Sequence, residues 1–499
     1  MMGDDRSSSH EVGRARTCDG DTRESQKGET VTRSEPGTPS PDRLLPADPT
    51  TRDVARELLR CVEDLPIVSP HGHVRASVIA DDEPFTDPAQ LLVTPDHYVT
   101  RLLHANGVAL ETLGVGESVA EPRAIWREFC GAWTVFDGTA SANWLASELA
   151  DLFDVRETPS RENADRLYDL IAARLREPEL RPRALVRSFA VEVLATTDDP
   201  LDDLVAHRRL AADPSFEARV IPTFRPDAYV DAASPDFAQR VDRLVAEAGE
   251  GRSGYDGYLT ALRSRRQYFI EAGATASDHG VRTPTSLKLD PTAAARLFDR
   301  VRRGGASRDD RDAFEAHMLY ESARMSVDDG LVMMVHPGSL RNYDPDTYAR
   351  YGADTGHDIP VPVEFATGLR PLLADFGNAP GLHVVVFTLD ESTFSRELAP
   401  LAGFYPSVYL GSPWWFLDAP DAMLRFRAAV TETVGFSRYG GFVDDTRAFC
   451  SIPARHNVAR RVEASFLARL VVEHRLTLER ARAIIVDVVD AAPRRAFKL

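Results

Sequence analysis

The sequence predicts an α/β fold organised as a (β/α)8 barrel of the TIM type, with a mostly helical insertion after the first strand. Two observations favour this fold. Eight short runs rich in aliphatic and β-branched residues recur along the 499 residues, separated by long helical stretches. Nearly every run ends in polar or ionisable side chains, and the carboxyl ends of the strands form the catalytic face of such a barrel. A doubly wound parallel sheet would give a similar pattern of runs, so the polar run ends favour the barrel.

The first 45 residues predict a disordered tail. The segment 1–45 is rich in Ser, Thr, Gly, Pro, Asp and Arg and nearly lacks aliphatic residues. Such a segment cannot bury enough apolar surface to offset the entropy lost on ordering. We expect 46–499 to form a single barrel domain, beginning with a helix in which Val54, Leu58, Leu59 and Val62 have helical spacing.

The predicted strands are the runs 67–73, 191–197, 220–225, 274–279, 331–336, 383–389, 408–414 and 441–445. Several runs, such as LVMMV and HVVVF, are continuously apolar, as expected for strands covered on both faces of a parallel sheet. The gap from about 75 to 185 is too long for one crossover between neighbouring strands. We therefore expect a mostly helical insertion there, with a helix at 162–176 near its end.

The charge balance limits the partners of the protein. With 77 acidic and 59 basic residues, the chain has a net charge of −18, which argues against a nucleic-acid or anionic-membrane partner. No apolar run reaches the roughly 20 residues of a membrane span, and the N-terminus lacks the apolar core of a signal peptide. The four cysteines show no CxxC spacing. We expect a soluble cytoplasmic protein.

Lysine is nearly absent, which limits the chemistry. Lys288 is the only lysine away from the termini, and it stands in no glycine-rich motif. A Schiff-base or P-loop mechanism would have to depend on that residue, so the sequence argues against both.

The strongest chemical signal is the sequence PHGH at the end of the first run. His71 and His73 stand at positions i and i+2, which project from the same face of a strand, so their imidazoles can converge on one divalent metal ion. A solvated turn with two incidental histidines is the alternative. His336 after LVMMV, and Asp444 or Asp445 after the last run, are further candidate ligands for a site with one open position.

Two arginines follow predicted strands in settings that suit an anionic ligand. Arg225 stands in PTFRPD, a turn bounded by prolines, from which a guanidinium can hold a carboxylate with two hydrogen bonds. A surface ion pair with Asp227 is the alternative. Arg447 follows Asp445 by two residues and offers a second pairing of a carboxylate with a guanidinium.

Aromatic residues form two further candidate groups. In the segment Asp96-His97-Tyr98, the alternative to a functional role is a helix cap followed by a packed ring. Trp414, in GSPWWF, predicts an aromatic wall facing a sugar, with ordinary packing between strands and helices as the alternative.

Together these motifs resemble the uronate (glucuronate) isomerase family, which belongs to the amidohydrolase-type barrel enzymes. The family's order and spacing are matched by PHGH, DHYVTRLLHANGV, VEVLATTDDP, PTFRPD, SDHG, HPGSLRN, GSPWWF and DDTRAFCSIPARH. The resemblance extends from about residue 53 to the C-terminus. It implies a distorted (β/α)8 barrel that interconverts D-glucuronate and D-fructuronate, and also D-galacturonate and D-tagaturonate, in hexuronate catabolism.

The resemblance also implies one divalent metal ion, expected to be zinc, and no organic cofactor. By resemblance, His71, His73 and Asp445 match the family's metal site, His336 matches its fifth-strand histidine, and its substrate-contacting and catalytic residues are matched by His97, Tyr98, Arg225 and Arg447. With the aromatic wall, we predict Tyr98, Asp445 and Arg447 for catalysis and His97, Arg225, His336 and Trp414 for the substrate. Related hydrolases often carry a carbamylated lysine on the fourth strand, and the absence of lysine near 277–280 favours the isomerase branch. The expected partner is a small hexuronate, and a homo-oligomer stays open.

From these residues we expect an aldose–ketose isomerisation through an enediol. Arg225, assisted by His97, would hold the substrate carboxylate. Tyr98 or Asp445 would carry the proton between C2 and C1. A tyrosine acting as a base near neutral pH needs a cation beside it, which Arg447 or the metal would supply.

Two other interpretations stay open at this point. A metal-dependent hydrolase or decarboxylase of the amidohydrolase type would share the two histidines and the aspartate after the last strand. A sugar-acid-binding regulator without activity is the non-catalytic alternative. The joint presence of the metal and catalytic residues argues against this alternative, because a relative without activity need not keep them.

Overall fold

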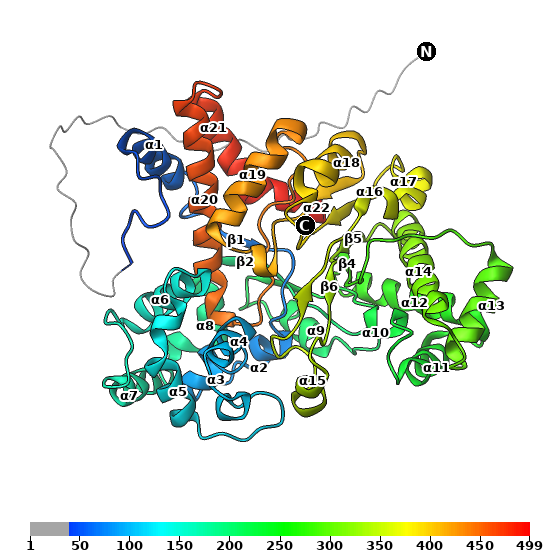
Figure 1. Cartoon of the computed structure of the whole chain (residues 1–499), viewed down its shortest axis with the longest axis horizontal. Coiled ribbons are helices and arrows are strands. Elements are labelled where there is room, and N and C mark those ends of the chain that lie inside the picture. The colour runs from blue at the N-terminus through cyan, green and yellow to red at the C-terminus, as the bar shows by residue number, and fades with distance from the viewer. Residues whose placement is uncertain (1–38) are drawn as a thin grey trace, which may run out of the picture. The chain divides into compact units, whose positions relative to one another are not determined.

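The computed structural model describes residues 39–499, and most of its short strands run parallel (Figure 1). The strands are β1 (Ile67–Ser69), β2 (Val191–Ala195), β3 (Arg219–Ile221), β4 (Ala276–His279), β5 (Val332–Val335), β6 (Ser339–Leu340), β7 (Ile359–Pro360), β8 (Val384–Val386) and β9 (Val408–Leu410). One parallel sheet has the order β1-β2-β3 and a second has the order β4-β5-β8-β9, while β6 and β7 pair antiparallel. The predicted α/β class with parallel strands is confirmed.

Helices occupy the connections between the parallel strands, precede the first strand and follow the last one. They are α1 (Pro49–Arg60), α2 (Ala76–Asp81), α3 (Pro88–Leu92), α4 (His97–Ala105), α5 (Pro122–Gly131), α6 (Ala140–Phe153), α7 (Ala164–Arg174), α8 (Pro182–Ser188), α9 (Val205–Ala211), α10 (Asp227–Val230), α11 (Phe237–Ala248), α12 (Gly254–Glu271), α13 (Pro291–Arg302), α14 (Arg308–Asp329), α15 (Pro345–Tyr351), α16 (Phe365–Gly368), α17 (Arg370–Phe376), α18 (Ala399–Phe404), α19 (Pro420–Val434), α20 (Ile452–Val472), α21 (Leu478–Val486) and α22 (Ala492–Phe497). Among the described residues, no helix is long and apolar enough to cross a bilayer.

The segment between β1 and β2, predicted as an insertion at about 75–185, consists mainly of the helices α2 to α8. Helices α5, α6 and α7 gather at one edge of Figure 1, and α20 runs from this group towards α1, packing against both α6 and α1. Because α20 contacts the insertion, it can carry side chains from the end of the chain to residues near its beginning.

The predicted tail differs from the structure at its C-terminal end. Residues 1–38 lie outside the described residues, but 39–45 are placed and packed. The Nη2 of Arg43 donates to Oδ1 of Asn457 at 3.1 Å, and Nη1 of Arg461 donates to the carbonyl of Pro41 at 2.6 Å. Helix α1 then begins at Pro49, because the side chain of Asp48 accepts from the backbone N–H of Thr51 at 2.8 Å and caps it.

The strands of the larger sheet are buried on both faces, as their apolar runs predict. Met333 and Val335 of β5 pack on one face, in a cluster with Val384 of β8 and residues of the surrounding helices. Met334 packs on the opposite face, in a cluster that contains Trp414. This period of two places one face of the sheet beside the residues of the candidate site.

A single bridge, rather than a continuous ladder, connects the two parallel sheets: Phe224, which also bridges Asp198, bridges Ser277. At the other end of the larger sheet, Leu410 of β9 bridges Tyr439, which belongs to no strand. The prediction of an eighth strand at 441–445 is wrong, because these residues form no strand. Asp445 has φ 41°, a left-handed value that breaks an extended backbone. The described strands therefore do not form one continuous eight-stranded sheet.

Candidate active site

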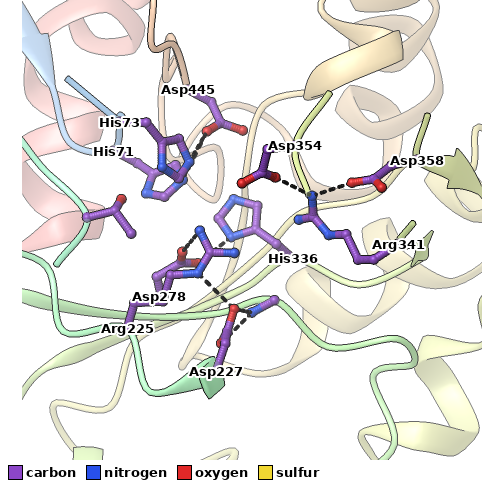
Figure 2. Close-up of polar contacts among 12 residues, drawn as sticks. His71, His73, Arg225, Asp227, Asp278, His336, Arg341, Asp354, Asp358 and Asp445 are labelled. Atoms are coloured by element: carbon purple, nitrogen blue, oxygen red, sulfur yellow. Dashed lines mark hydrogen bonds and ion pairs between the residues drawn. The ribbon is translucent and has the colours of Figure 1, made fainter. Parts of the chain in front are cut away.

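Two histidines and an aspartate from distant parts of the sequence meet just beyond the end of β1 (Figure 2). The Nε2 atoms of His71 and His73 lie 3.2 Å and 3.0 Å from Oδ1 of Asp445. Backbone hydrogen bonds join the two segments: His73 donates to the carbonyl of Thr446 at 2.9 Å, and Asp445 donates to that of His71 at 3.3 Å. Surrounding contacts thus hold the strained backbone of Asp445 and aim its carboxylate.

His336, which follows β5, joins this group. Its ring stacks on that of His71 with centroids 4.7 Å apart, and its Nδ1 lies 2.7 Å from Oδ1 of Asp278. Its buried Nε2 has no hydrogen-bond partner among the described residues. Ligand atoms of His71, His336 and Asp445 lie within 4.8 Å of one another, a grouping that could hold one metal ion. A carboxylate behind a ligating imidazole is typical of metal centres, so the residues fit a divalent ion.

The electrostatics of this group also suit a metal ion. Burial lowers the pKa of His73 and of His336, which favours the neutral imidazoles that metal ligands require. Burial acts in the same direction on His71, but the carboxylates of Asp278 and Asp445 outweigh it and raise the pKa of that imidazole. Burial by itself would raise the pKa of Asp445, but the neighbouring imidazoles of His71 and His73 hold it well below its usual range. Asp444, the alternative ligand from the sequence, does not belong to this group, and its Oδ2 lies 3.1 Å from Nε2 of His456.

A pocket adjoins the residues His71, His73, His336 and Asp445, which we call the metal-type group. Seven of the nine predicted site residues line this pocket. Its lining is His73, Pro95, Asp96, His97, Tyr98, Arg225, Arg341, Asp354, Trp414, Trp415, Asp445, Thr446, Arg447 and Ala448. His71 and His336 are buried and do not line it. The geometry groups His336 with the metal-type residues, as its place after LVMMV suggested, and not with the substrate-binding residues among which it was finally predicted. Trp414 agrees with both interpretations of its segment, an aromatic wall and ordinary packing. It lines the pocket, and it packs edge-on against His336 with ring centroids 4.9 Å apart.

Arg225 enters the pocket with two carboxylates behind it. Its Nε lies 2.8 Å from Oδ2 of Asp227, so the ion pair considered as an alternative is present, and its Nη1 lies 3.5 Å from Oδ2 of Asp278. Gly280 makes room for this arrangement, since a Cβ there would lie 2.7 Å from Oδ2 of Asp227 and 2.9 Å from Nη2 of Arg225. Its backbone N–H also donates to Asp227.

We predict that Gly280→Ala raises the KM for a uronate about tenfold, because the added methyl group displaces Arg225 and misaligns a group that positions the substrate. Initial-rate kinetics over a range of uronate concentrations measure this effect. Gly305→Ala is the matched control, because a Cβ at Gly305 meets no atom within 4 Å. Equal KM values for the two variants would contradict the prediction.

Two charged lining residues, Arg341 and Asp354, were missed by the sequence analysis, and both lie in the segment between β6 and β7. Arg341 contacts Asp358 at 2.8 Å and Asp354 at 3.8 Å (Figure 2). Asp354 also contacts Nη2 of Arg447 at 2.9 Å. Arg341 lies within the motif HPGSLRN, so a signal for it existed. Asp354 stands in a polar loop outside every motif, and only the fold brings it to the pocket.

His97 and Tyr98 begin helix α4. Asp96 caps this helix by accepting from the backbone N–H of Tyr98 at 2.8 Å, as the cap interpretation of this segment proposed. The two rings stack with centroids 4.8 Å apart. Burial and the charge of Arg447 lower the pKa of His97 to about 3, so this imidazole is neutral near pH 7. Burial raises the pKa of Tyr98.

Parallel strands with a histidine–aspartate metal-type group beyond their carboxyl ends are the arrangement of an α/β enzyme with a metal-type site. A family model described as glucuronate isomerase matches residues 49–495. The chain belongs to the glucuronate isomerase family. A uronate isomerase from Corynebacterium efficiens is 54% identical over 461 residues, which cover 92% of this chain and 98% of that protein.

Solved structures agree with this assignment. The crystal structure of glucuronate isomerase from Caulobacter crescentus is similar, with a TM-score of 0.91 and 45% identity, covering 93% of this chain and 98% of that chain. A uronate isomerase from Thermotoga maritima has a TM-score of 0.86 and 28% identity, covering 92% of this chain and 99% of that chain. The isomerase interpretation is thus favoured over the hydrolase or decarboxylase.

Proposed function

We propose that this protein interconverts D-glucuronate and D-fructuronate, and D-galacturonate and D-tagaturonate. The observation that carries the proposal is one pocket in which Tyr98, Arg225 and Arg447 face Asp445 of the metal-type group. The pocket thus combines cationic groups for a uronate with groups that can move a proton. Membership of the glucuronate isomerase family supports the same substrates.

Local arginines, rather than the overall field, would bind the substrate. A net charge of −18 repels a hexuronate anion weakly at long range. Arg225, fixed by Asp227 and Asp278, offers a guanidinium of defined orientation to the substrate carboxylate. The neutral imidazole of His97 then contributes a hydrogen bond without adding charge.

Tyr98 and Asp445 are the proposed proton carriers. A base removes the proton at C2 of the open-chain aldehyde while O1 takes up a proton, which gives an enediol; the O2 hydroxyl then loses its proton as C1 receives one, which gives the ketose. Arg447 and the hydroxyl of Tyr98 would stabilise the negative charge that develops on the carbonyl oxygen. His71, His73, Asp445 and His336 would hold a divalent ion, proposed to be zinc, which when bound supplies Lewis-acid polarisation of substrate oxygens.

We also propose that the strands and the segment 439–446 together form a distorted (β/α)8 barrel. The bridges of Phe224 to both Asp198 and Ser277 support a connection between β3 and β4. The bridge between Leu410 and Tyr439, and the hydrogen bond from His73 to Thr446, support closure between β9 and β1. The segment 439–446 would then take the place of an eighth strand without forming one.

The test is incubation of the purified protein with D-glucuronate or D-galacturonate, followed by NMR detection of the 2-ketose. We expect ketose from at least one hexuronate, and none from D-glucose, which lacks the carboxylate. A pentose would instead indicate a decarboxylase, and no ketose from either hexuronate would overturn the proposal.

Three further experiments test the remaining proposals. Loss of activity on removal of bound metal with a chelator, and its return with Zn²⁺, tests the proposed zinc ion. We also propose that the protein forms a homo-oligomer in the cytoplasm. Size-exclusion chromatography tests the oligomer, and cell fractionation tests the location.

A further inference from the structure

Tyr98 rests against a buried arginine that the sequence analysis did not single out. The Cζ atom of Arg455, on α20, lies 4.9 Å from the centroid of the Tyr98 ring and 3.7 Å from that of Trp144. Trp144 meets Tyr98 edge-to-face with centroids 5.5 Å apart. A guanidinium within about 6 Å of an aromatic centroid is attracted by the ring, more strongly where water is excluded. Arg455 therefore touches both members of an aromatic pair from the helical insertion.

Polar contacts fix the position of Arg455. Its Nη1 lies 2.8 Å from Oδ2 of Asp418, and its Nε donates to Oγ of Ser451 at 3.0 Å. The side chain is 1% exposed. Its buried Nη2 has no hydrogen-bond partner among the described residues. The guanidinium is thus held in one place while keeping an uncommitted N–H group.

The position of this charge matters because Tyr98 is buried. Burial raises the pKa of Tyr98, and the charge of Arg455 is the largest influence that lowers it. In the sequence analysis, Arg447 or the metal was expected to supply the cation beside this tyrosine. The structure places Arg455 on the ring itself, whereas Arg447 is paired with Asp354.

We propose that Arg455 is a positioning residue for catalysis: it fixes the ring of Tyr98 at the pocket and stabilises negative charge on its phenolic oxygen during proton transfer. This inference rests on the proposed function of Tyr98. Asp418 and Ser451 act through Arg455, since they set the place of its guanidinium. Arg455 itself does not line the pocket.

The first test compares Arg455→Lys with Arg427→Lys. Arg427 is also 1% exposed, is paired with Glu463 at 3.1 Å and lies over the rings of Tyr439 and Phe436, but it does not line the pocket. Both variants lose a buried planar guanidinium, so their folding costs are comparable. We expect Arg455→Lys to lower kcat about 10- to 100-fold with KM changed less than about threefold, and Arg427→Lys to leave kcat unchanged.

The second test is a double-mutant cycle with Tyr98→Phe, which keeps the ring and removes the hydroxyl. If Arg455 acts through that hydroxyl, Arg455→Lys should change turnover less than about twofold when Tyr98→Phe is already present. End-point assays with concentrated enzyme extend the measurable range. If the doubly substituted protein stays below detection, the comparison of kcat and KM with Arg427→Lys decides alone. Asp418→Asn, which keeps Arg455 but removes its carboxylate partner, replaces Arg455→Lys if the latter does not fold, and is expected to lower kcat.

The outcomes separate this inference from the proposed function. No ketose from the unmodified protein overturns the isomerase, and full turnover by Tyr98→Phe overturns the role of Tyr98. Impaired Tyr98→Phe together with unimpaired Arg455→Lys overturns only the role of Arg455. An equal loss from Arg455→Lys with and without Tyr98→Phe also overturns it, since a merely structural role predicts that result.

Discussion

Asp445→Asn is expected to lower turnover of a hexuronate by at least about three orders of magnitude. The substitution preserves the size of the side chain but removes the negative charge that lies 3.2 Å and 3.0 Å from the imidazoles of His71 and His73. Asparagine is a much weaker ligand for a divalent ion than a carboxylate, and it cannot act as a base. Metal content per chain and the initial rate of ketose formation should therefore fall together.

Asp444→Asn is the matched control for this prediction. It makes the same chemical change one residue earlier, on a carboxylate that pairs with His456 and is not a member of the metal-type group. We expect it to keep the bound metal, measured by elemental analysis of the purified protein. Asp445→Asn that retains one ion per chain and more than a tenth of the turnover would contradict both roles assigned to Asp445.

Tyr98→Phe is expected to lower kcat about 10²- to 10⁴-fold, the usual contribution of a positioned proton donor or acceptor. The ring contacts with His97, Trp144 and Arg455 do not involve the hydroxyl, so the pocket should keep its shape. KM for the uronate should change little, because the carboxylate is held elsewhere. Steady-state kinetics at saturating uronate measure the loss.

Tyr258→Phe provides the comparison for Tyr98→Phe. The hydroxyl of Tyr258 donates to the carbonyl of Tyr229 at 2.8 Å in a core cluster away from the pocket. Losing that hydrogen bond should lower the free energy of unfolding by about 1 kcal/mol and leave kcat unchanged. A kcat that falls equally in both variants would show that the hydroxyl of Tyr98 matters for stability rather than for proton transfer.

Apolar runs in the sequence located most of the parallel strands. Runs such as LVMMV and HVVVF report burial on both faces, and each contains an observed strand, β5 and β8. The eighth run could not be judged in the same way. A left-handed backbone at Asp445, imposed by contacts with His71 and its neighbours, cannot be predicted from local preferences.

The site was predictable where motifs follow strands. PHGH and the segment of Asp445 and Arg447 stand at run ends, and the structure brings them together. Asp354 and Arg455 were not predicted, because their contacts join segments that are far apart in the sequence. Arg455 reaches Tyr98, 357 positions earlier in the chain, only because α20 lies along the helical insertion.

The ion pair between Asp354 and Arg447 makes binding in the pocket an exchange of partners. With its Nη2 2.9 Å from the carboxylate of Asp354, Arg447 already has an internal competitor for any ligand oxygen. A ligand that takes over this guanidinium gains only the difference between the new contact and the one it displaces. We therefore expect ligands with weakly basic oxygens to compete poorly with Asp354, so that neutral sugars with most of the shape of a hexuronate bind more weakly than the hexuronate itself.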